Sequence, residues 1–278
     1  ALRLGVAELH LDQARDLDVE ARAARTGLEQ LGLDRLEPGR VAAQEPDRRL
    51  GGEELDRKTG EWKIRQGPIF ANIILADEIN RAPAKVQSAL LEAMAERQVT
   101  VGKTTYPLPS LFLVMATQNP LEQEGTYPLP EAQLDRFLMH LEVDYPGAET
   151  EIEILRLTRG EALSQKVEPP TPLTQLEIFD ARKEVLSIHL ADELEQYLVD
   201  LIIATRQPGK YDKDLAKWIA FGASPRATIS LDKCARANAW LDGRDFVTPN
   251  DIQTVIFDCL RHRLLLSYEE EAAGIDAN

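Results

Sequence analysis

The sequence predicts an α/β domain with a parallel sheet, followed by a helical domain. Two nearly continuous apolar runs, 69–76 and 111–116, have the pattern of strands that are buried on both faces of a parallel sheet. The segment between them, 83–97, carries apolar residues at helical spacing. After the prolines at 169–172 the apolar pattern is helical and no strand is expected. Strands that alternate with helices are typical of the α/β class.

Each element of the α/β part has a local sequence signal. Pro83 is placed in the first turn of the helix over 83–97, where its missing N–H has no cost. A hairpin is expected over 98–106, with its turn at Gly102-Lys103. The other elements expected here are a helix near Pro130, a strand over 138–143 and a helix from Ala148 to Gly160.

The helical part has clear helix starts. A helix is expected from Leu190 to Arg206, and Ser224-Pro225 begins another. The last helix begins with Thr248 as N-cap, Pro249 at the first position and Asp251 at the third. We therefore predict three parts: 1–50, which is unassigned, an α/β core over 51–160 and a helical domain over 174–270.

Composition excludes several classes of protein. With 278 residues, of which 44% are hydrophobic and 28% charged, the chain is globular in composition. The net charge of −15 disfavours general binding to nucleic acid. No apolar run approaches the roughly 20 residues of a membrane helix and no leader is apparent, so we expect a soluble, cytoplasmic protein. Cys234 and Cys259 fit no metal spacing and are expected to be reduced core thiols.

Two acids, Asp77 and Glu78, follow the first buried strand. Ligands of open α/β sheets bind at the carboxyl ends of the strands. In a nucleotide hydrolase the first of two such acids holds Mg²⁺ through its water shell, and the second polarises the attacking water. Asp77 and Glu78 fit these roles. The alternative is that the pair only caps the following helix.

Five segments together resemble the MoxR family of AAA+ ATPases, over about residues 53–270. They match, in order, the family's Walker B region, its next helix and hairpin, sensor 1, the arginine-finger segment and sensor 2. The segments are Gly67–Ala82, Gln87–Val99, Ala116-Thr117-Gln118-Asn119-Pro120, Glu124–Phe137 and Gly222-Ala223-Ser224-Pro225-Arg226-Ala227. The resemblance implies a P-loop-type AAA+ sheet domain, followed by an all-helical lid domain, that uses ATP and Mg²⁺.

The resemblance also implies a role for each site residue. Asp77 would bind nucleotide and Mg²⁺ through water, and Glu78 and Asn119 would act on the attacking water or the γ-phosphate. Arg136 would reach the γ-phosphate of a neighbouring subunit, and Arg226 the nucleotide of its own subunit. The alternatives are an Asx turn at Asn119, a solvated surface side chain at Arg136 and a domain-interface salt bridge at Arg226.

Family membership would make the chain a subunit of a homo-oligomeric, hexameric ring. Such a ring couples ATP hydrolysis to the remodelling or maturation of a protein partner, for example one with a von Willebrand factor A domain. Neither nucleic acid nor a membrane span is expected. Two alternatives stay open: a non-hydrolysing scaffold subunit, and a magnesium-chelatase-type motor subunit, with which the string from Thr59 to Phe70 is consistent.

The first fifty residues depart from the family pattern. A P-loop needs glycines that cradle phosphates and a lysine that reaches them. The family's spacing places it near residue 20, yet 13–21 contains neither residue type, and the first lysine of the chain is Lys58. Residues 1–50 also lack Ile, Phe, Tyr, Trp, Ser, Asn, Met and Cys. Either this segment is read from a different frame of GC-rich DNA, or the subunit has lost nucleotide binding.

Overall fold

A computed structural model describes most of the chain after residue 66 and four strands before it. The described residues are 2–7, 38–42, 52–55, 62–65, 67–101, 104–119, 126–143, 145–162, 172–269, 274, 275 and 277. Residues 13–21, where the resemblance places the P-loop, lie outside the described residues. The chain forms two compact units, which are described separately below. The α/β unit is 1–4, 11–128 and 142–175, and the lid unit is 5–10, 129–141 and 176–278.

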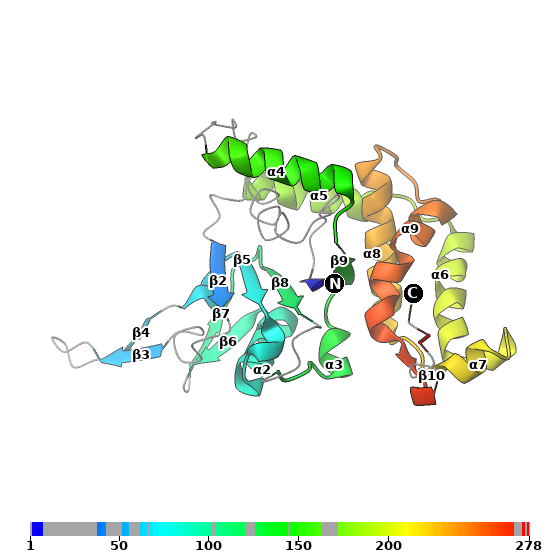
Figure 1. Cartoon of the computed structure of the whole chain (residues 1–278), viewed down its shortest axis with the longest axis horizontal. Helices are drawn as coiled ribbons and strands as arrows, with labels where there is room; N and C mark the ends of the chain where they lie inside the picture. The colour runs from blue at the N-terminus through cyan, green and yellow to red at the C-terminus, as the bar shows by residue number, and fades with distance from the viewer. Residues whose placement is uncertain are drawn as a thin grey trace. The chain divides into compact units, whose positions relative to one another are not determined.

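The main sheet has five strands. Their order is β2 (Pro38–Ala42), β5 (Ile73–Asp77), β8 (Leu113–Gln118), β1 (Leu2–Ala7) and β9 (Met139–Val143). β2 and β8 both run parallel to β5, and Ile73 pairs with Pro38 on one side and Leu113 on the other. The predicted parallel sheet is thus confirmed, and β5 and β8 lie side by side in Figure 1. The unassigned first fifty residues contribute two of its strands.

The two apolar runs form strands with shifted limits. In the first run, Pro68–Phe70 is a 3₁₀ turn in which the Phe70 N–H bonds to the Gly67 carbonyl, so β5 begins only at Ile73. Proline has a fixed φ and no N–H to give to a sheet, which explains why the strand is delayed. In the second run, β8 extends to Gln118, two residues past the expected end. Ile73, Ile74 and Leu113 are almost completely buried, as the apolar pattern predicts.

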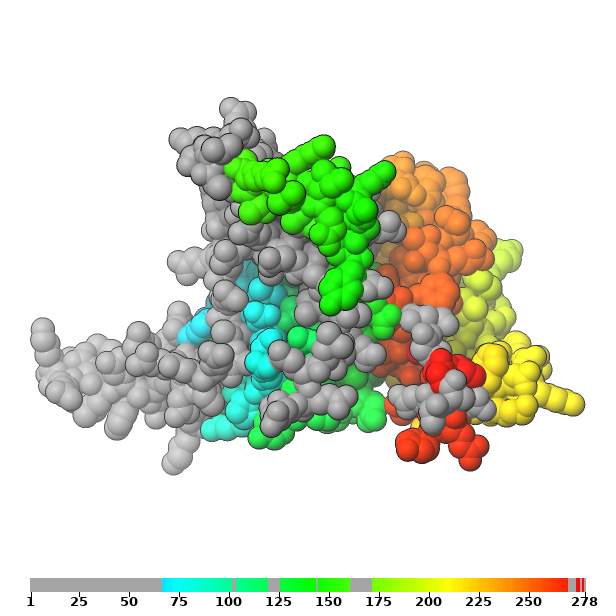
Figure 2. Space-filling view, viewed as in Figure 1, coloured from blue at the N-terminus to red at the C-terminus, as the bar shows by residue number. Residues whose placement is uncertain are grey.

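The other elements of the α/β unit include the predicted helix and hairpin. The helix is α2 (Ala84–Glu96), and β6 (Gln98–Val101) and β7 (Thr104–Pro107) form the antiparallel hairpin, whose turn lies outside the described residues. The remaining elements are β3 (Gly52–Leu55), β4 (Trp62–Arg65) and α4 (Ala148–Ala162). Helix α4 passes Gly160 by two residues, and most of its side chains are exposed, as its green surface in Figure 2 illustrates.

The lid unit is mainly helical. Its helices are α3 (Glu131–Leu134), α5 (Gln175–Ser187, from Leu176 on), α6 (Asp192–Arg206), α7 (Leu215–Trp218), α8 (Pro225–Leu241) and α9 (Pro249–Leu260). The expectation that it contains no strand is wrong, because β10 (Ile219–Phe221) pairs antiparallel with β11 (Leu265–Leu266). Strands of two or three residues are too short to show an alternating pattern, so the sequence does not reveal them.

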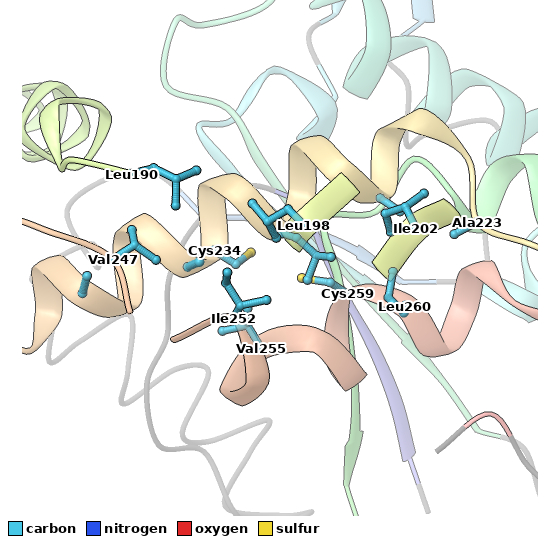
Figure 3. Packing of buried hydrophobic residues seen from close by; sticks show 14 of the residues in the cluster. Leu190, Leu198, Ile202, Ala223, Cys234, Val247, Ile252, Val255, Cys259 and Leu260 are labelled. Carbon is cyan, nitrogen blue, oxygen red and sulfur yellow. The ribbon is translucent and has the colours of Figure 1, made fainter. Parts of the chain in front are cut away.

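Helices α8 and α9 pack around one apolar core. Figure 3 shows Cys234 and Cys259 within it, and both thiols are free and fully buried, as predicted. A hydrogen bond with Cys259 and burial raise the pKa of Cys234. The start of α9 is confirmed too: the buried Asp251 carboxylate accepts the Thr248 N–H at 2.7 Å, which closes the capping box. No helix in the described residues is long and apolar enough to cross a membrane.

A close backbone contact fixes the loop that leads into α8. A Cβ added at Gly222 would overlap the carbonyl oxygen of Thr205 and lie 2.6 Å from the Arg206 nitrogen. Two hydrogen bonds hold the next residue: Ala223 N–H donates to Thr205 Oγ1 at 3.0 Å, and Arg206 Nε donates to the Ala223 carbonyl at 2.7 Å. The absence of a side chain at Gly222 therefore lets this loop lie against the end of α6.

We predict that Gly222→Ala destabilises the lid unit by about 1–3 kcal/mol, because the new methyl group must displace backbone rather than a flexible side chain. Thermal unfolding of the full chain measures the change. Gly209→Ala is the matched control, since among the described residues its Cβ would meet only the Ala216 methyl, at 3.6 Å. Equal melting temperatures for the two variants would contradict this account of Gly222.

Candidate functional site

The end of β5 brings Asp77 and Glu78 to a buried threonine on β8. The strand register pairs Ala76 with Ala116, so Asp77 and Thr117 are the next residues on neighbouring strands. The Thr117 hydroxyl donates to Asp77 Oδ1 at 2.8 Å and accepts the Glu78 N–H, also at 2.8 Å. The two acids named from the sequence are thus joined by a residue that sequence reasoning did not single out.

Glu78 has an unusual backbone conformation. Its φ of 50° and ψ of 52° lie in the left-handed region, which residues other than glycine rarely occupy. Its carboxylate pairs with Arg81, with 3.2 Å between Oε2 and Nη1. Residues held in this region concentrate at active sites and switch regions, so the strain marks this turn as a candidate functional site. Glu78 is the N-cap residue of the 3₁₀ turn Ile79–Arg81, but its side chain makes no cap hydrogen bond there.

Asn119 lies at the same edge of the sheet, one residue past the end of β8. It is half-buried. Because β5 and β8 are parallel neighbours, Asn119 and the acids follow the carboxyl ends of adjacent strands. The structure therefore places Asp77, Glu78 and Asn119 at one edge, as the sequence predicts.

A buried amide on α2 holds the turn that follows Glu78. Gln87 is 3% exposed, and its Nε2 donates to the carbonyl of Ile79 at 3.1 Å and to that of Tyr127 at 3.0 Å. The Tyr127 N–H in turn donates to the Asn80 carbonyl at 2.6 Å. Sequence reasoning missed this function of Gln87. The signal in the sequence is weak: Gln87 is a polar residue that follows Val86, one of the apolar residues at helical spacing in 83–97.

In the lid unit, Arg226 forms an ion pair. Its Nη1 lies 3.2 Å from Asp135 Oδ2, and about half of the Arg226 side chain is exposed. Ser224 caps α8 by accepting the Arg226 N–H, and its hydroxyl also lies 2.8 Å from Asp135 Oδ1. Asp135 therefore contacts both the start of α8 and the side chain of Arg226, which the family resemblance assigns to the nucleotide of its own subunit. The alternative for Arg226 was a salt bridge at a domain interface, whereas this ion pair joins two residues of the lid unit.

Arg263 is a second cation at Asp135 that sequence reasoning missed. Its side chain is 1% exposed, and its Nε donates to Asp135 Oδ1 at 3.0 Å. Its other nitrogens donate to backbone carbonyls, among them that of Phe137, at 2.5 Å, and that of Cys259 on α9. Burial lowers the pKa of Arg263, while the Asp135 charge opposes that effect. The buried charge is offset by hydrogen bonds that attach 135–138 to the helices of the lid unit.

His262 lies beside this network and is neutral. Burial, followed by the Arg263 charge and then His140, lowers the pKa of His262 to about 2. Its Nε2 lies 3.2 Å from the Phe137 carbonyl, and its ring meets that of His140 edge to face at 5.6 Å between centroids. The described residues contain no group of three His, Cys, Asp or Glu side chains that could hold a metal ion.

Arg136 is exposed and follows Asp135 directly in the chain. Helix α3 is a single turn that ends at Leu134, and Arg136 follows that end by two residues. The Arg136 N–H donates to the Gln133 carbonyl, a tight i to i−3 contact of the kind found where an α-helix ends. Its neighbour Asp135 is fixed by Ser224, Arg226 and Arg263, so the backbone that carries Arg136 is well anchored.

Known families match both parts of the chain. Residues 43–139 match the ATPase family associated with various cellular activities (AAA), and residues 214–278 match the AAA lid domain. A crystal structure of a candidate ATPase from Cytophaga hutchinsonii superposes with a TM-score of 0.83 at 42% identity, and covers 92% of this chain and 78% of that one. The α/β sheet unit and the mainly helical lid unit are therefore those of an AAA+ protein.

Curated relatives narrow the family. Chaperone MoxR1 of Mycobacterium tuberculosis is 49% identical over 229 residues, which are 82% of this chain and 58% of the relative. Protein MoxR of Methylorubrum extorquens is 33% identical over 236 residues, which are 78% of this chain and 67% of the relative. A magnesium-chelatase subunit ChlI of Nicotiana tabacum is more distant, at 32% over 195 residues and 42% of its length. The chain thus spans a little over half of the MoxR1 relative, and it belongs to the MoxR family of AAA+ ATPases.

Proposed function

We propose that this protein hydrolyses ATP with Mg²⁺ and couples hydrolysis to the remodelling or maturation of a protein partner. The observation that carries the proposal is the turn at Asp77 and Glu78. Both acids are fixed at the carboxyl edge of a parallel sheet, and Glu78 is held in a strained conformation by hydrogen bonding. Family membership supports nucleotide as the ligand.

The side chains at this edge suit the proposed chemistry. The carboxylate of Asp77 is a hard oxygen donor at a strand end, the type of ligand that Mg²⁺ prefers, directly or through water. Mg²⁺ bound there would neutralise charge on the phosphates. Glu78 would orient the attacking water and accept its proton, and Asn119 would hold that water or the γ-phosphate. Arg226 would bind the nucleotide of its own subunit, in exchange for its contact with Asp135.

Arg136 would act on a neighbouring subunit. Its exposure and anchored backbone are the properties needed by an arginine that stabilises the transition state in trans. This role requires a homo-oligomeric ring, which we propose to be hexameric and cytoplasmic. A protein that carries a von Willebrand factor A domain is our proposed partner. The higher identity to Chaperone MoxR1, 49%, than to the chelatase subunit, 32%, favours remodelling of a protein over a chelatase motor.

A non-hydrolysing scaffold subunit is the second candidate function. It is favoured by one observation: residues 13–21 contain neither Gly nor Lys. A titration with fluorescent ATP separates the two candidates. Micromolar binding in the presence of Mg²⁺ supports the hydrolase, whereas no binding supports the scaffold.

We expect Glu78→Gln to lower the kcat for ATP hydrolysis by about 10²–10⁴-fold while ATP binding is kept, because the amide cannot accept a proton from water. Steady-state hydrolysis and ATP titration of the full chain measure the two effects. Glu153→Gln, an exposed position on α4, is the matched control and should behave as wild type. Unchanged hydrolysis in Glu78→Gln would refute the role of Glu78.

We expect Arg136→Ala to abolish hydrolysis in homogeneous assemblies and to leave ATP binding unchanged, since the arginine would serve the neighbouring site. Mixing Arg136→Ala with Glu78→Gln should restore part of the rate, because each mixed interface can combine an intact Glu78 with an intact Arg136. Arg156→Ala on exposed α4 is the control for loss of a surface charge. No recovery in mixtures would argue against action in trans.

A further inference from the structure

One buried hydroxyl connects the two candidate acids. Thr117 is 6% exposed and follows the buried apolar residues 113–116 of β8. Its Oγ1 lies 2.8 Å from Asp77 Oδ1 and 2.8 Å from the Glu78 nitrogen. In the chain Thr117 follows Met115 and Ala116, which are apolar and buried, and it precedes Gln118, the last residue of β8.

The chemistry of the hydroxyl fixes the direction of both hydrogen bonds. A hydroxyl has one proton and two lone pairs. The Glu78 N–H can only donate, so Thr117 accepts from it and gives its own proton to Asp77. The carboxylate of Asp77 and the backbone of Glu78 are therefore set relative to each other by a single atom on the neighbouring strand.

The left-handed backbone at Glu78 needs such a partner. A φ of 50° is unfavourable for a side chain with a Cβ, and it persists only where surrounding contacts enforce it. Thr117 holds the Glu78 N–H, and Arg81 holds the carboxylate, with 3.2 Å between Nη1 and Oε2. The backbone is thus fixed from β8 and the side chain from the following 3₁₀ turn, Ile79–Arg81.

We propose that Thr117 is a positioning residue for hydrolysis: it holds Asp77 in its orientation and Glu78 in its strained conformation, so that both acids face the nucleotide together. The proposal rests on the proposed ATP hydrolysis. Thr117 itself touches neither nucleotide nor water in this role. It acts through the two acids, in the way that outer residues orient the ligands of a metal site.

Two substitutions separate the hydroxyl from the shape of the side chain. Thr117→Val keeps the branched shape, removes the hydroxyl and leaves the Glu78 N–H without its acceptor. We expect it to lower kcat by about 10–100-fold and to raise the Mg²⁺ concentration needed for half-maximal rate, with the KM for ATP changed less than kcat. Thr117→Ser restores the hydroxyl and should recover most of the rate.

Val114→Ala is the control for a purely structural effect. Val114 is 1% exposed on the same strand, and it lies outside the hydrogen bonds of the two acids. The variant should lower the melting temperature and leave the Mg²⁺ dependence as in wild type. The proposal is overturned if Thr117→Val keeps the wild-type kcat, if Thr117→Ser is as slow as Thr117→Val, or if Val114→Ala gives the same change in Mg²⁺ dependence.

Crystal structures of the Thr117 variants test the positioning without any activity. We expect Glu78 to leave the left-handed region in Thr117→Val and to keep it in Thr117→Ser. A Thr117→Val structure with Glu78 still near a φ of 50° and Asp77 unmoved would overturn the inference. If wild-type protein hydrolyses no ATP, the proposed function fails, and these structures still decide whether Thr117 sets the two acids.

Discussion

The parallel pairing of β5 with β8 is the constraint on which the candidate site depends. It brings the end of an apolar strand, with its two acids, beside Thr117 on the next strand. Without this register the Glu78 N–H would have no acceptor in the sheet, and its left-handed conformation would lack support. Burial of the apolar parts of both strands stabilises the pairing, so the hydrophobic core of the unit also sets the geometry of its polar edge.

The lid unit is organised by a buried charge. The guanidinium of Arg263 is almost fully enclosed, and a charge in that environment is tolerated only if nearly all its donors find acceptors. It finds them in Asp135 and in the carbonyls of Phe137 and Leu138. The same contacts place segment 129–141, which carries Arg136, with the lid helices in one compact unit. Arg136, which we propose to act on a neighbouring subunit, thus follows an aspartate that is held by Arg226 and Arg263 of the lid unit.

Local sequence signals predicted those elements whose stability comes from their own residues. The start of α9 is an example, because Thr248 and Asp251 are three residues apart and their capping contacts are local. The strand β10 and its partner β11 were missed for the opposite reason: each is two or three residues long, and they are more than forty residues apart in the chain. Only the folded lid unit brings them together.

The sequence alone determined the family, the α/β and lid arrangement, and a candidate edge with Asp77, Glu78 and Asn119. These follow from strand ends and motif strings, which are contiguous in the chain. The tertiary structure decided which residues hold that edge and the arginines. Thr117 is 40 residues from Asp77, and Arg263 is 128 residues from Asp135. Hydrogen bonds over such separations leave no periodic pattern in a sequence, because they depend on strand register and helix packing.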